Sequence, residues 1–399
     1  MKTLMILGAS ILQLPAIKKA KEMDLNVVAV DMNPNAIGFK EDGIEKEIIS
    51  TIDIPKVVEA AKKHKIDGIM TLASDMPMRT IAAVSKELNL IGISEETALK
   101  ATNKAVMRDT LKNGNVPIPL YYKVSNIDDF YKSVNNIKSK GYKVITKPAD
   151  NSGSRGIDLI EDFSQENLEK IYNYTKEYSR SGDILVEEYM EGPEVSVETL
   201  TTNGECHVIQ ITDKLTTGAP YFVEMGHSQP SQLPYDIKMK IEEVAIAANK
   251  AIGITNGPSH TEIKVTKDGP KIVELGARLG GDNITTHLVP LSTGVDMVEA
   301  CIKISLGEKP DIAKKIEKAS AIRYIDSHNG VIKDITGIEN VKSMNGIRQV
   351  SIVHNIGEEL NDIKSSTDRI GFIIAQGKTA TETIGICERA EKQINVVYE

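Results

Sequence analysis

The stretch HTEIKVTKDGPKIVELGARLGGD, residues 260–282, has the pattern of a β-hairpin that runs into a glycine-rich loop. Two runs rich in β-branched residues flank the turn segment KDGP at residues 267–270, which is typical of paired antiparallel strands. The strands carry two glutamates, and the loop adds an arginine, adjacent glycines and an aspartate: Glu262, Glu274, Arg278, Gly280, Gly281 and Asp282. Carboxylates, a guanidinium and glycine backbone this close together in the sequence indicate a binding site for a charged ligand.

The length of the turn decides whether the two glutamates face each other. A two-residue loop at residues 268–269 sets Glu262 opposite Leu275, which leaves Glu262 and Glu274 on opposite faces. A three-residue loop at residues 267–269 sets Glu262 opposite Glu274 on one face. Facing carboxylates repel each other unless a cation lies between them, and Mg²⁺ prefers oxygen ligands of this kind. The sequence leaves both registers open.

Composition argues against several classes of protein. The length of 399 residues suggests roughly two to four domains or subdomains. The formal net charge of −8 predicts no nucleic-acid partner, and because no apolar run reaches the ~18 residues of a membrane span, we expect no membrane association. Three widely spaced cysteines without a C-x-x-C motif argue against disulfides or structural zinc and predict a reducing, cytoplasmic location.

The first hundred residues alternate strands with helices. Strand TLMILGA at residues 3–9 precedes a helix around residues 15–23 and strand NVVAVD at residues 26–31. This alternation predicts a doubly wound parallel sheet rather than a secretion signal, because Gly8 interrupts the first apolar run and no A-x-A cleavage site follows. The segment GAS at residues 8–10 is not a G-x-G-x-x-G fingerprint, which argues against an NAD site.

Capping residues mark the helices that follow. Asp53 and Asn103 are expected N-caps, and Gly114 is the expected left-handed residue after the second of these helices. Asp75 follows strand DGIMTL at the end where open α/β sheets place ligands; it is either an N-cap or a ligand for an amine.

The rest of the chain predicts α+β structure. We expect short strands and one long polar helix between residues 120 and 185, then strands broken by a helix around residues 237–251, and a smaller α+β unit from about residue 308.

A strand that delivers Lys147 leads into the loop PADNSGSRG at residues 148–156. Backbone N–H groups of small, glycine-containing loops can approach phosphate oxygens, and Ser152 and Ser154 add hydroxyls. An ordinary hairpin turn has the same composition, so this alternative stays open.

The segment VEEYMEGPE at residues 186–194 ends a strand in an acidic bend. It is either a solvated turn or a nucleoside hinge, in which backbone groups pair with adenine and a carboxylate accepts from ribose. Lys214 has a similar ambiguity between a γ-phosphate ligand and a surface lysine. His227 is expected to line a pocket, and His260 to be structural.

These motifs in this order resemble the ATP-grasp superfamily. The combination is T-N-K-x-x-x-R at residues 102–108, K-P-x-x-x-S-G-S-x-G at residues 147–156, V-E-E-Y at residues 186–189, and the glutamate pair on the late hairpin. The resemblance implies an α/β and α+β architecture. Its parts are an N-terminal Rossmann-like pre-ATP-grasp domain (1–100), an ATP-grasp domain of two α+β subdomains (101–307) whose lid is about 118–188, and a C-terminal α+β domain (308–399).

The resemblance also implies roles for individual residues, with ATP and Mg²⁺ as cofactors and Mn²⁺ as the alternative ion. ATP phosphates would be contacted by Lys104, Lys147, Lys214 and the loop residues Ser152, Gly153, Ser154 and Gly156. The adenine hinge would comprise Glu187, the Glu188 backbone and Met190, with Glu194 on the ribose. Glu262 and Glu274 would bind the metal.

Within the superfamily, the run at residues 274–296 and the segment VEMGHSQPS at residues 223–231 are similar to L-amino-acid ligases (dipeptide synthetases) and related carboxylate–amine ligases. This likeness implies a carboxylate activated as an acyl phosphate and coupled to an amine, giving an amide, ADP and phosphate. The small-molecule carboxylate and amine would meet Arg278, as a catalytic residue with Lys147, and the pocket residues His227, Gly281, Asp282 and Asp75. We expect Asp282 to select the substrate. A homodimer follows only by analogy.

One position departs from the family pattern. Many members carry Asn two residues after the second metal glutamate, where this chain has Gly276. Two alternatives stay open: an ATP-grasp ligase of purine, cofactor or sugar-acid metabolism, or a nucleotide-binding module without turnover.

Overall fold

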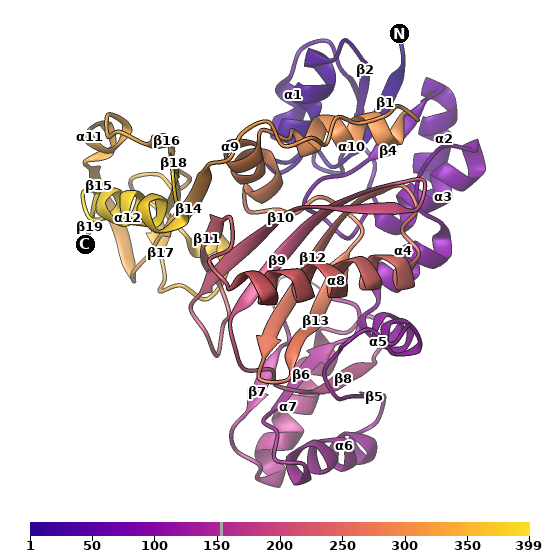
Figure 1. The fold of residues 1–399 in the computed structure, drawn as a ribbon, viewed down its shortest axis with the longest axis vertical. Helices are drawn as coiled ribbons and strands as arrows, with labels where there is room; N and C mark the ends of the chain where they lie inside the picture. The colour runs from indigo at the N-terminus through magenta and orange to yellow at the C-terminus, as the bar shows by residue number, and fades with distance from the viewer. Residues whose placement is uncertain (152–154) are drawn as a thin grey trace.

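The N-terminal residues form the expected parallel sheet. The computed structural model describes residues 1–151 and 155–399, and its first strands pair in the order β3-β2-β1-β4 (Figure 1). These strands are β1 (Thr3–Leu7), β2 (Asn26–Val30), β3 (Glu45–Glu47) and β4 (Gly68–Met70), all parallel. The helical segments are α1 (Leu14–Glu22), η1 (Ile37–Lys40), α2 (Ile54–His64), α3 (Met78–Leu88), α4 (Glu95–Thr102) and α5 (Lys104–Asn113). Strand β3 was not expected, since the sequence EKE carries no strand signal.

Two of the expected caps are confirmed. Asp53 accepts a hydrogen bond from the backbone N–H of Lys56 at the start of α2, and Asn103 does the same for Val106 in α5. The prediction of Asp75 as an N-cap is wrong, because Pro77 occupies that position in α3.

Gly114 is not the left-handed residue after α5. It is the C-cap itself with φ −82°, and the left-handed conformation falls on Asn115, with φ 55°. Glycine is needed here for a different reason, since a Cβ at position 114 would lie 2.9 Å from the Cβ of Ala251 in the helix that packs against α5.

The next residues form a small antiparallel sheet at the bottom of Figure 1, in the order β5-β8-β6-β7. Its strands are β5 (Tyr121–Val124), β6 (Val144–Pro148), β7 (Asp158–Ile160) and β8 (Ile184–Glu188). The sheet packs against α6 (Ile127–Ser139) and α7 (Gln165–Glu177). Only one helix was expected between residues 120 and 185. Helix α6 was not predicted, although the buried Phe130, Val134 and Ile137 have helical spacing.

A large sheet occupies the centre of Figure 1, in the order β13-β12-β9-β10-β11-β14-β18-β16. Its strands are β9 (Glu194–Thr202), β10 (Glu205–Thr216), β11 (Glu224–Gln229), β12 (Gly257–Thr266), β13 (Gly269–Gly276), β14 (Ala319–Ile325), β16 (Ile347–Ile352) and β18 (Gly371–Gly377). The helix expected around residues 237–251 is confirmed as α8 (Tyr235–Ile252), which packs on β10, β12 and β13.

The C-terminal residues continue this sheet, because β14 pairs with β11. A further sheet has the order β17-β15-β19, with β15 (Gly330–Thr336), β17 (Glu359–Leu360) and β19 (Asn395–Tyr398). The remaining helical segments are η2 (Ile284–Leu288), α9 (Val289–Thr293), α10 (Met297–Ser305), α11 (Ile338–Lys342), η3 (Ser366–Asp368) and α12 (Ala380–Glu391). Within residues 1–151 and 155–399, no helix has the length and apolarity needed to cross a membrane.

The loop after β13 joins the N-terminal sheet to the large sheet. Leu279 forms a parallel bridge with Leu72 just beyond β4, and its carbonyl accepts from the N–H of Ala73. Asp282 and Asn283 then adopt left-handed backbone conformations, with φ 50° and 62°. This contact brings the carboxyl edge of the parallel sheet to the glycine-rich loop.

Candidate active site

A cavity of about 620 Å³ lies where these parts meet. The N-terminal sheet contributes residues 73–75 beyond β4, and the C-terminal residues contribute Lys364, Ser365 and Ser366. The predicted site residues that line it are Asp75, Lys104, Lys147, Glu188, Met190, Glu194, Lys214, His227, Glu262, Glu274, Arg278, Gly281 and Asp282. The structure therefore brings most of the predicted site into one space.

The hairpin places the two glutamates directly opposite each other, but not through either expected turn. The loop is Lys267 and Asp268, because Thr266 pairs with Gly269. This turn alone would set Glu262 opposite Val273. The register shifts between Glu262 and the next residue, which makes Val273 a bulge and moves Glu274 into the facing position. Of the two registers that the sequence left open, the one with facing glutamates is observed. The loop has two residues, as in the other alternative, but it lies one position earlier in the chain.

Each facing carboxylate already has a cation beside it. Lys104 Nζ lies 2.8 Å from Glu274, and Lys214 Nζ lies 2.9 Å from Glu262, with His260 Nε2 at 3.5 Å. Burial opposes ionisation of Glu262, but Lys214 and His260 hold its pKa well below the ordinary value. Glu262 is therefore ionised, and the two facing carboxylates offer oxygen ligands of the kind that a divalent ion prefers.

The donor set fits Mg²⁺ only in part. Among the described residues, no group of three or more His, Cys, Asp or Glu side chains could hold a metal. Two carboxylates leave most of an octahedral Mg²⁺ shell to phosphate oxygens and water, which is the arrangement common in phosphoryl-transfer sites. Glu262 and Glu274 thus suit a metal that arrives with a nucleotide.

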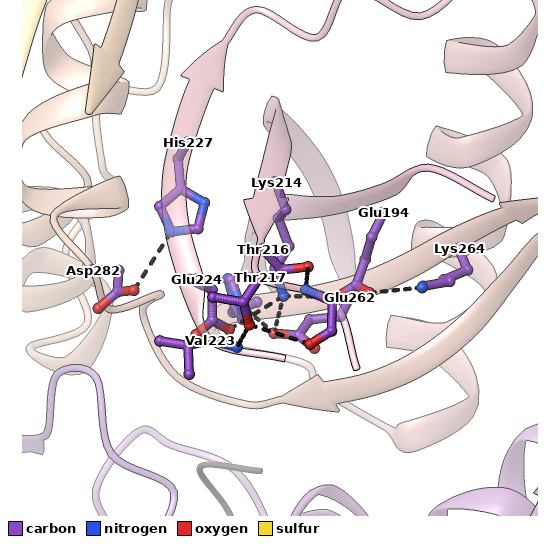
Figure 2. Close-up of polar contacts among 12 residues, drawn as sticks. Glu194, Lys214, Thr216, Thr217, Val223, Glu224, His227, Glu262, Lys264 and Asp282 are labelled. Carbon is purple, nitrogen blue, oxygen red and sulfur yellow. Dashed lines mark hydrogen bonds and ion pairs between the residues drawn. The ribbon is translucent and has the colours of Figure 1, made fainter. Parts of the chain in front are cut away.

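Lys214 lies at the centre of an acidic cluster (Figure 2). Its Nζ is 2.8 Å from Glu194 and 3.6 Å from Glu224, in addition to its contact with Glu262. Glu194 also lies 3.5 Å from Lys264, whose ammonium stands 5.4 Å from the ring centre of Tyr189. The Lys214 ammonium is therefore buried among carboxylates and has a structural role. Both Lys214 and Glu194 also line the cavity.

Lys147 forms part of a buried ion network that the sequence analysis missed. Its Nζ lies 3.1 Å from Glu187 Oε2. Arg108 Nε and Nη2 donate to the same carboxylate at 2.6 and 3.2 Å. Burial opposes ionisation of Glu187, but the two cations outweigh it and hold its pKa at about 2. Arg108, the last residue of the T-N-K-x-x-x-R motif, was the one signal of this network in the sequence. Its partners could not be predicted, because Glu187 and Val273 lie on strands far away in the chain.

The adenine-hinge prediction needs correction at Glu187 and Glu188. Glu187 is fully buried, so its side chain belongs to the ion network and not to the cavity wall. The N–H of Glu188 donates to Leu120 O, and its carboxylate accepts from Leu120 N–H and Lys271. Met190 lines the cavity as expected.

The predicted phosphate loop is described in part. Ser152, Gly153 and Ser154 lie outside the described residues. Gly156 has φ +76°, and a Cβ there would lie 2.6 Å from the Cβ of Tyr178. The need for glycine at 156 therefore comes from backbone conformation and close packing, which differs from the predicted phosphate contact.

Asp75 holds Arg278 in place. Arg278 Nε and Nη2 each donate to the carboxylate at 3.1 Å. This pair also explains Gly276, because a Cβ at that position would lie 2.6 Å from Asp75 Oδ1. The space that an Asn side chain would need is thus filled by a carboxylate from the N-terminal part of the chain.

Asp282 lines the cavity, but its charge is already neutralised. Arg369, from the loop before β18, donates to both carboxylate oxygens at 2.9 and 3.1 Å. The guanidinium stacks 3.7 Å above the ring of Tyr324, whose hydroxyl donates to Asp282 O. Burial raises the pKa of Asp282, but His227 and Arg369 together hold it well below its ordinary value. This pairing weakens the hypothesis that Asp282 selects a cationic substrate.

His227 projects from β11 and is buried at the cavity wall (Figure 2). Its Nε2 lies 3.5 Å from Asp282, an ion pair only when the ring is protonated. Neither ring nitrogen has a hydrogen-bond partner within the part of the chain that the structure describes. A buried polar group without a partner is costly, so a ligand that bonds to it would be favoured.

The adjacent glycines are explained by packing. A Cβ at Gly280 would lie 2.7 Å from His260 Nδ1 and 2.8 Å from Glu198 Oε2. His260 and Glu198 form a buried pair, in which Nδ1 lies 2.6 Å from Oε1. A Cβ at Gly281 would contact Ala73. His260 is structural as expected, and it also lines the cavity beside Glu262.

Known proteins with similar sequences share this architecture. A model described as ATP-grasp domain matches residues 140–286, and one described as L-amino acid ligase C-terminal domain 2 matches residues 323–399. An L-arginine-specific L-amino acid ligase of Bacillus subtilis is 28% identical, covering 78% of this chain and 75% of that protein. Phosphoribosylamine–glycine ligase of Methanocaldococcus jannaschii is 24% identical, covering 95% and 90%.

Solved structures confirm the predicted fold class. The L-amino acid ligase from Bacillus licheniformis aligns with a TM-score of 0.86 at 21% identity, over 100% of this chain and 99% of that one. The chain is therefore similar in sequence both to amino-acid ligases and to phosphoribosylamine–glycine ligases. By these matches, residues 140–286 are an ATP-grasp domain and residues 323–399 are a C-terminal domain of the L-amino acid ligase type.

Proposed function

We propose that the protein is an ATP-dependent ligase that activates the carboxylate of an L-amino acid and couples it to an amine. The observation that carries this proposal is that one cavity holds Lys104 and Lys147 together with two facing glutamates and an arginine clamped by Asp75. The match of residues 323–399 to L-amino acid ligases favours an amino acid over a purine precursor.

In this proposal Lys104 and Lys147 bind the phosphates of ATP, while Met190 and Glu194 line the nucleoside end. A magnesium or manganese ion held by Glu262 and Glu274 would neutralise phosphate charge. Phosphoryl transfer depends mainly on positioning and charge neutralisation, which suits a site of cations and carboxylates.

Arg278 acts at the point of transfer. The substrate carboxylate attacks the γ-phosphate, which gives an acyl phosphate and releases ADP. The amine then attacks the acyl carbon, which forms the amide and releases phosphate. Arg278 stabilises the negative charge on the transferred group, and His227 offers a hydrogen bond to the amino-acid substrate beside the backbone of Gly281.

A phosphate-release screen tests the proposal. Pairs of L-amino acids and small carboxylates are incubated with ATP and Mg²⁺, and the products are identified by mass spectrometry. We expect ADP, phosphate and a dipeptide in equal amounts for at least one pair. A product only from glycine with phosphoribosylamine would support the second candidate, which the relative from Methanocaldococcus jannaschii suggests. Nucleotide binding with no ADP formed would indicate a module without turnover.

A further inference from the structure

We infer that Arg108 is a positioning residue that fixes the phosphate-binding Lys147 and the metal-binding Glu274 relative to each other. The inference rests on the proposed function, which gives those two residues their roles. Arg108 lies in α5, and its side chain is 1% exposed. Besides its two bonds to Glu187, its Nη2 donates to the carbonyl oxygen of Val273 at 2.7 Å. One guanidinium thus joins β8 of the small sheet to β13 of the large sheet.

The contact with Glu187 keeps Lys147 available to an anion. Arg108, Lys147 and Glu187 carry two positive charges and one negative charge within hydrogen-bonding distance. The network therefore has a net positive charge, and Lys147 is the member that lines the cavity. Without Arg108, the buried carboxylate would have Lys147 as its remaining partner, which would weaken the attraction of that lysine for a phosphate.

The contact with Val273 supports the register of the metal pair. Val273 is the bulged residue that brings Glu274 opposite Glu262. A bulge leaves one residue without its ladder partner, so the freed carbonyl needs another donor. Arg108 supplies that donor with a charged group, which makes a stronger hydrogen bond than a neutral one. Without this donor, Val273 would be less firmly held, and so would Glu274, the next residue in the chain.

Two variants that differ only at Arg108 isolate the contact with Val273. Glu187→Gln removes the buried carboxylate charge and keeps the guanidinium. Arg108→Met/Glu187→Gln removes both of these charges, so no carboxylate is left without Arg108, and Val273 O loses its donor. Lys147 loses its carboxylate partner equally in both variants, so it does not contribute to the difference between them. Binding of Mn²⁺ in the presence of ADP is measured by electron paramagnetic resonance, which counts free Mn²⁺ directly and requires no turnover.

We expect Glu187→Gln to bind Mn²⁺ within about threefold of the unmodified protein, and the double variant about tenfold more weakly than Glu187→Gln. Circular dichroism and thermal melting show whether both variants fold. Equal Mn²⁺ affinity in the two folded variants would overturn the inference. If the unmodified protein itself binds no Mn²⁺ with ADP, the proposed function fails instead.

The contact with Glu187 has its own test. In Arg108→Met the carboxylate keeps its charge and competes for Lys147, so binding of ADP without metal should weaken about tenfold. The double variant should recover most of that affinity while its Mn²⁺ affinity stays low. Arg108→Lys, which retains a cation for Glu187, replaces Arg108→Met if the latter does not fold. A uniform loss of both affinities that the double variant does not separate would indicate a general structural role and contradict the inference.

Discussion

At the scale of single residues, the end of β13 and the loop after it take their counter-charges from three separate parts of the chain. Glu274 pairs with Lys104 of α5 at 2.8 Å, and Arg278 pairs with Asp75 beyond β4 at 3.1 Å. Asp282 pairs with Arg369 of the C-terminal residues at 2.9 Å. Each charge is therefore fixed in direction before a ligand arrives, which reduces the reorganisation that a reaction would need.

Substitution of Glu274 tests the proposed metal pair. Glu274→Gln keeps the size of the side chain but removes the charge that faces Glu262, so we expect ADP formation with substrate present to be abolished. Glu191→Gln is the matched control, because Glu191 is an exposed glutamate that pairs with Lys143. Unchanged ADP release by Glu274→Gln would exclude this carboxylate as a metal ligand.

The pair of His260 and Glu198 predicts a pH-dependent stability. Burial disfavours the charged ring, but Glu198 outweighs it and raises the pKa of His260 from 6.5 to about 9. A raised pKa stabilises the folded state below pH 6.5, and that contribution is lost as pH rises through 9. We compare the unmodified protein with His260→Gln/Glu198→Gln by urea unfolding without metal. The unmodified protein should have a higher free energy of unfolding than the variant, and this difference should be larger at pH 6 than at pH 9.5 by up to about 3 kcal/mol. A difference that does not change with pH would contradict the raised pKa of His260.

At the scale of elements, α5 connects local sequence to the site. The Asn103 cap begins the helix directly at Lys104, and one turn later Arg108 points into the space between the small and large sheets. The position of both side chains depends on how closely α5 approaches α8, where Gly114 meets Ala251.

A methyl group at Gly114 probes that approach. Because φ of this residue is −82°, alanine causes no backbone strain, but its Cβ would lie 2.9 Å from that of Ala251. We expect Gly114→Ala to lower the free energy of unfolding by about 1–3 kcal/mol, measured by urea denaturation. Gly114→Ala/Ala251→Gly removes the clash and should recover part of the loss, less the cost of a glycine in α8. No recovery would show that the helix contact is not the cause.

The hairpin shows how far sequence reasoning reaches at this scale. Strand pattern and spacing predicted β12 and β13, because period-two alternation is a local property, but they left the register of the two glutamates open. The turn was wrong because a bulge costs little locally and is stabilised by Arg108, which is 165 residues away from Val273 in the chain. Helix α6 was missed despite its Asn126 cap, since its polar surface obscured a narrow apolar stripe.

At the scale of the whole molecule, the C-terminal residues form part of the cavity wall. Lys364, Ser365 and Ser366 line the cavity, and Arg369 fixes Asp282. Most of the residues between 75 and 282 that line the cavity were predicted from the sequence, because their motifs in this order resemble a known family. It did not predict Arg369, since nothing near position 369 indicates a partner 87 residues away.

The contact between Arg369 and Asp282 predicts a marked loss of stability. Arg369→Met leaves the half-buried carboxylate of Asp282 without its guanidinium partner, which should cost about 1–3 kcal/mol in urea unfolding. Asp282→Asn/Arg369→Met has no unpaired charge and should recover most of that loss. If Asp282→Asn alone is as damaging as Arg369→Met, the effect does not come from an unpaired charge.

The link between Asp282 and Arg369 has a consequence for exchanging parts between related ligases. A chimaera that receives another protein's residues after β13, or another C-terminal region, inherits only half of this ion pair. Positions 282 and 369 must therefore be transplanted together, or both made neutral. Grafts that respect this pairing keep the shape of the cavity wall, and those that separate it leave an unpaired charge at that wall.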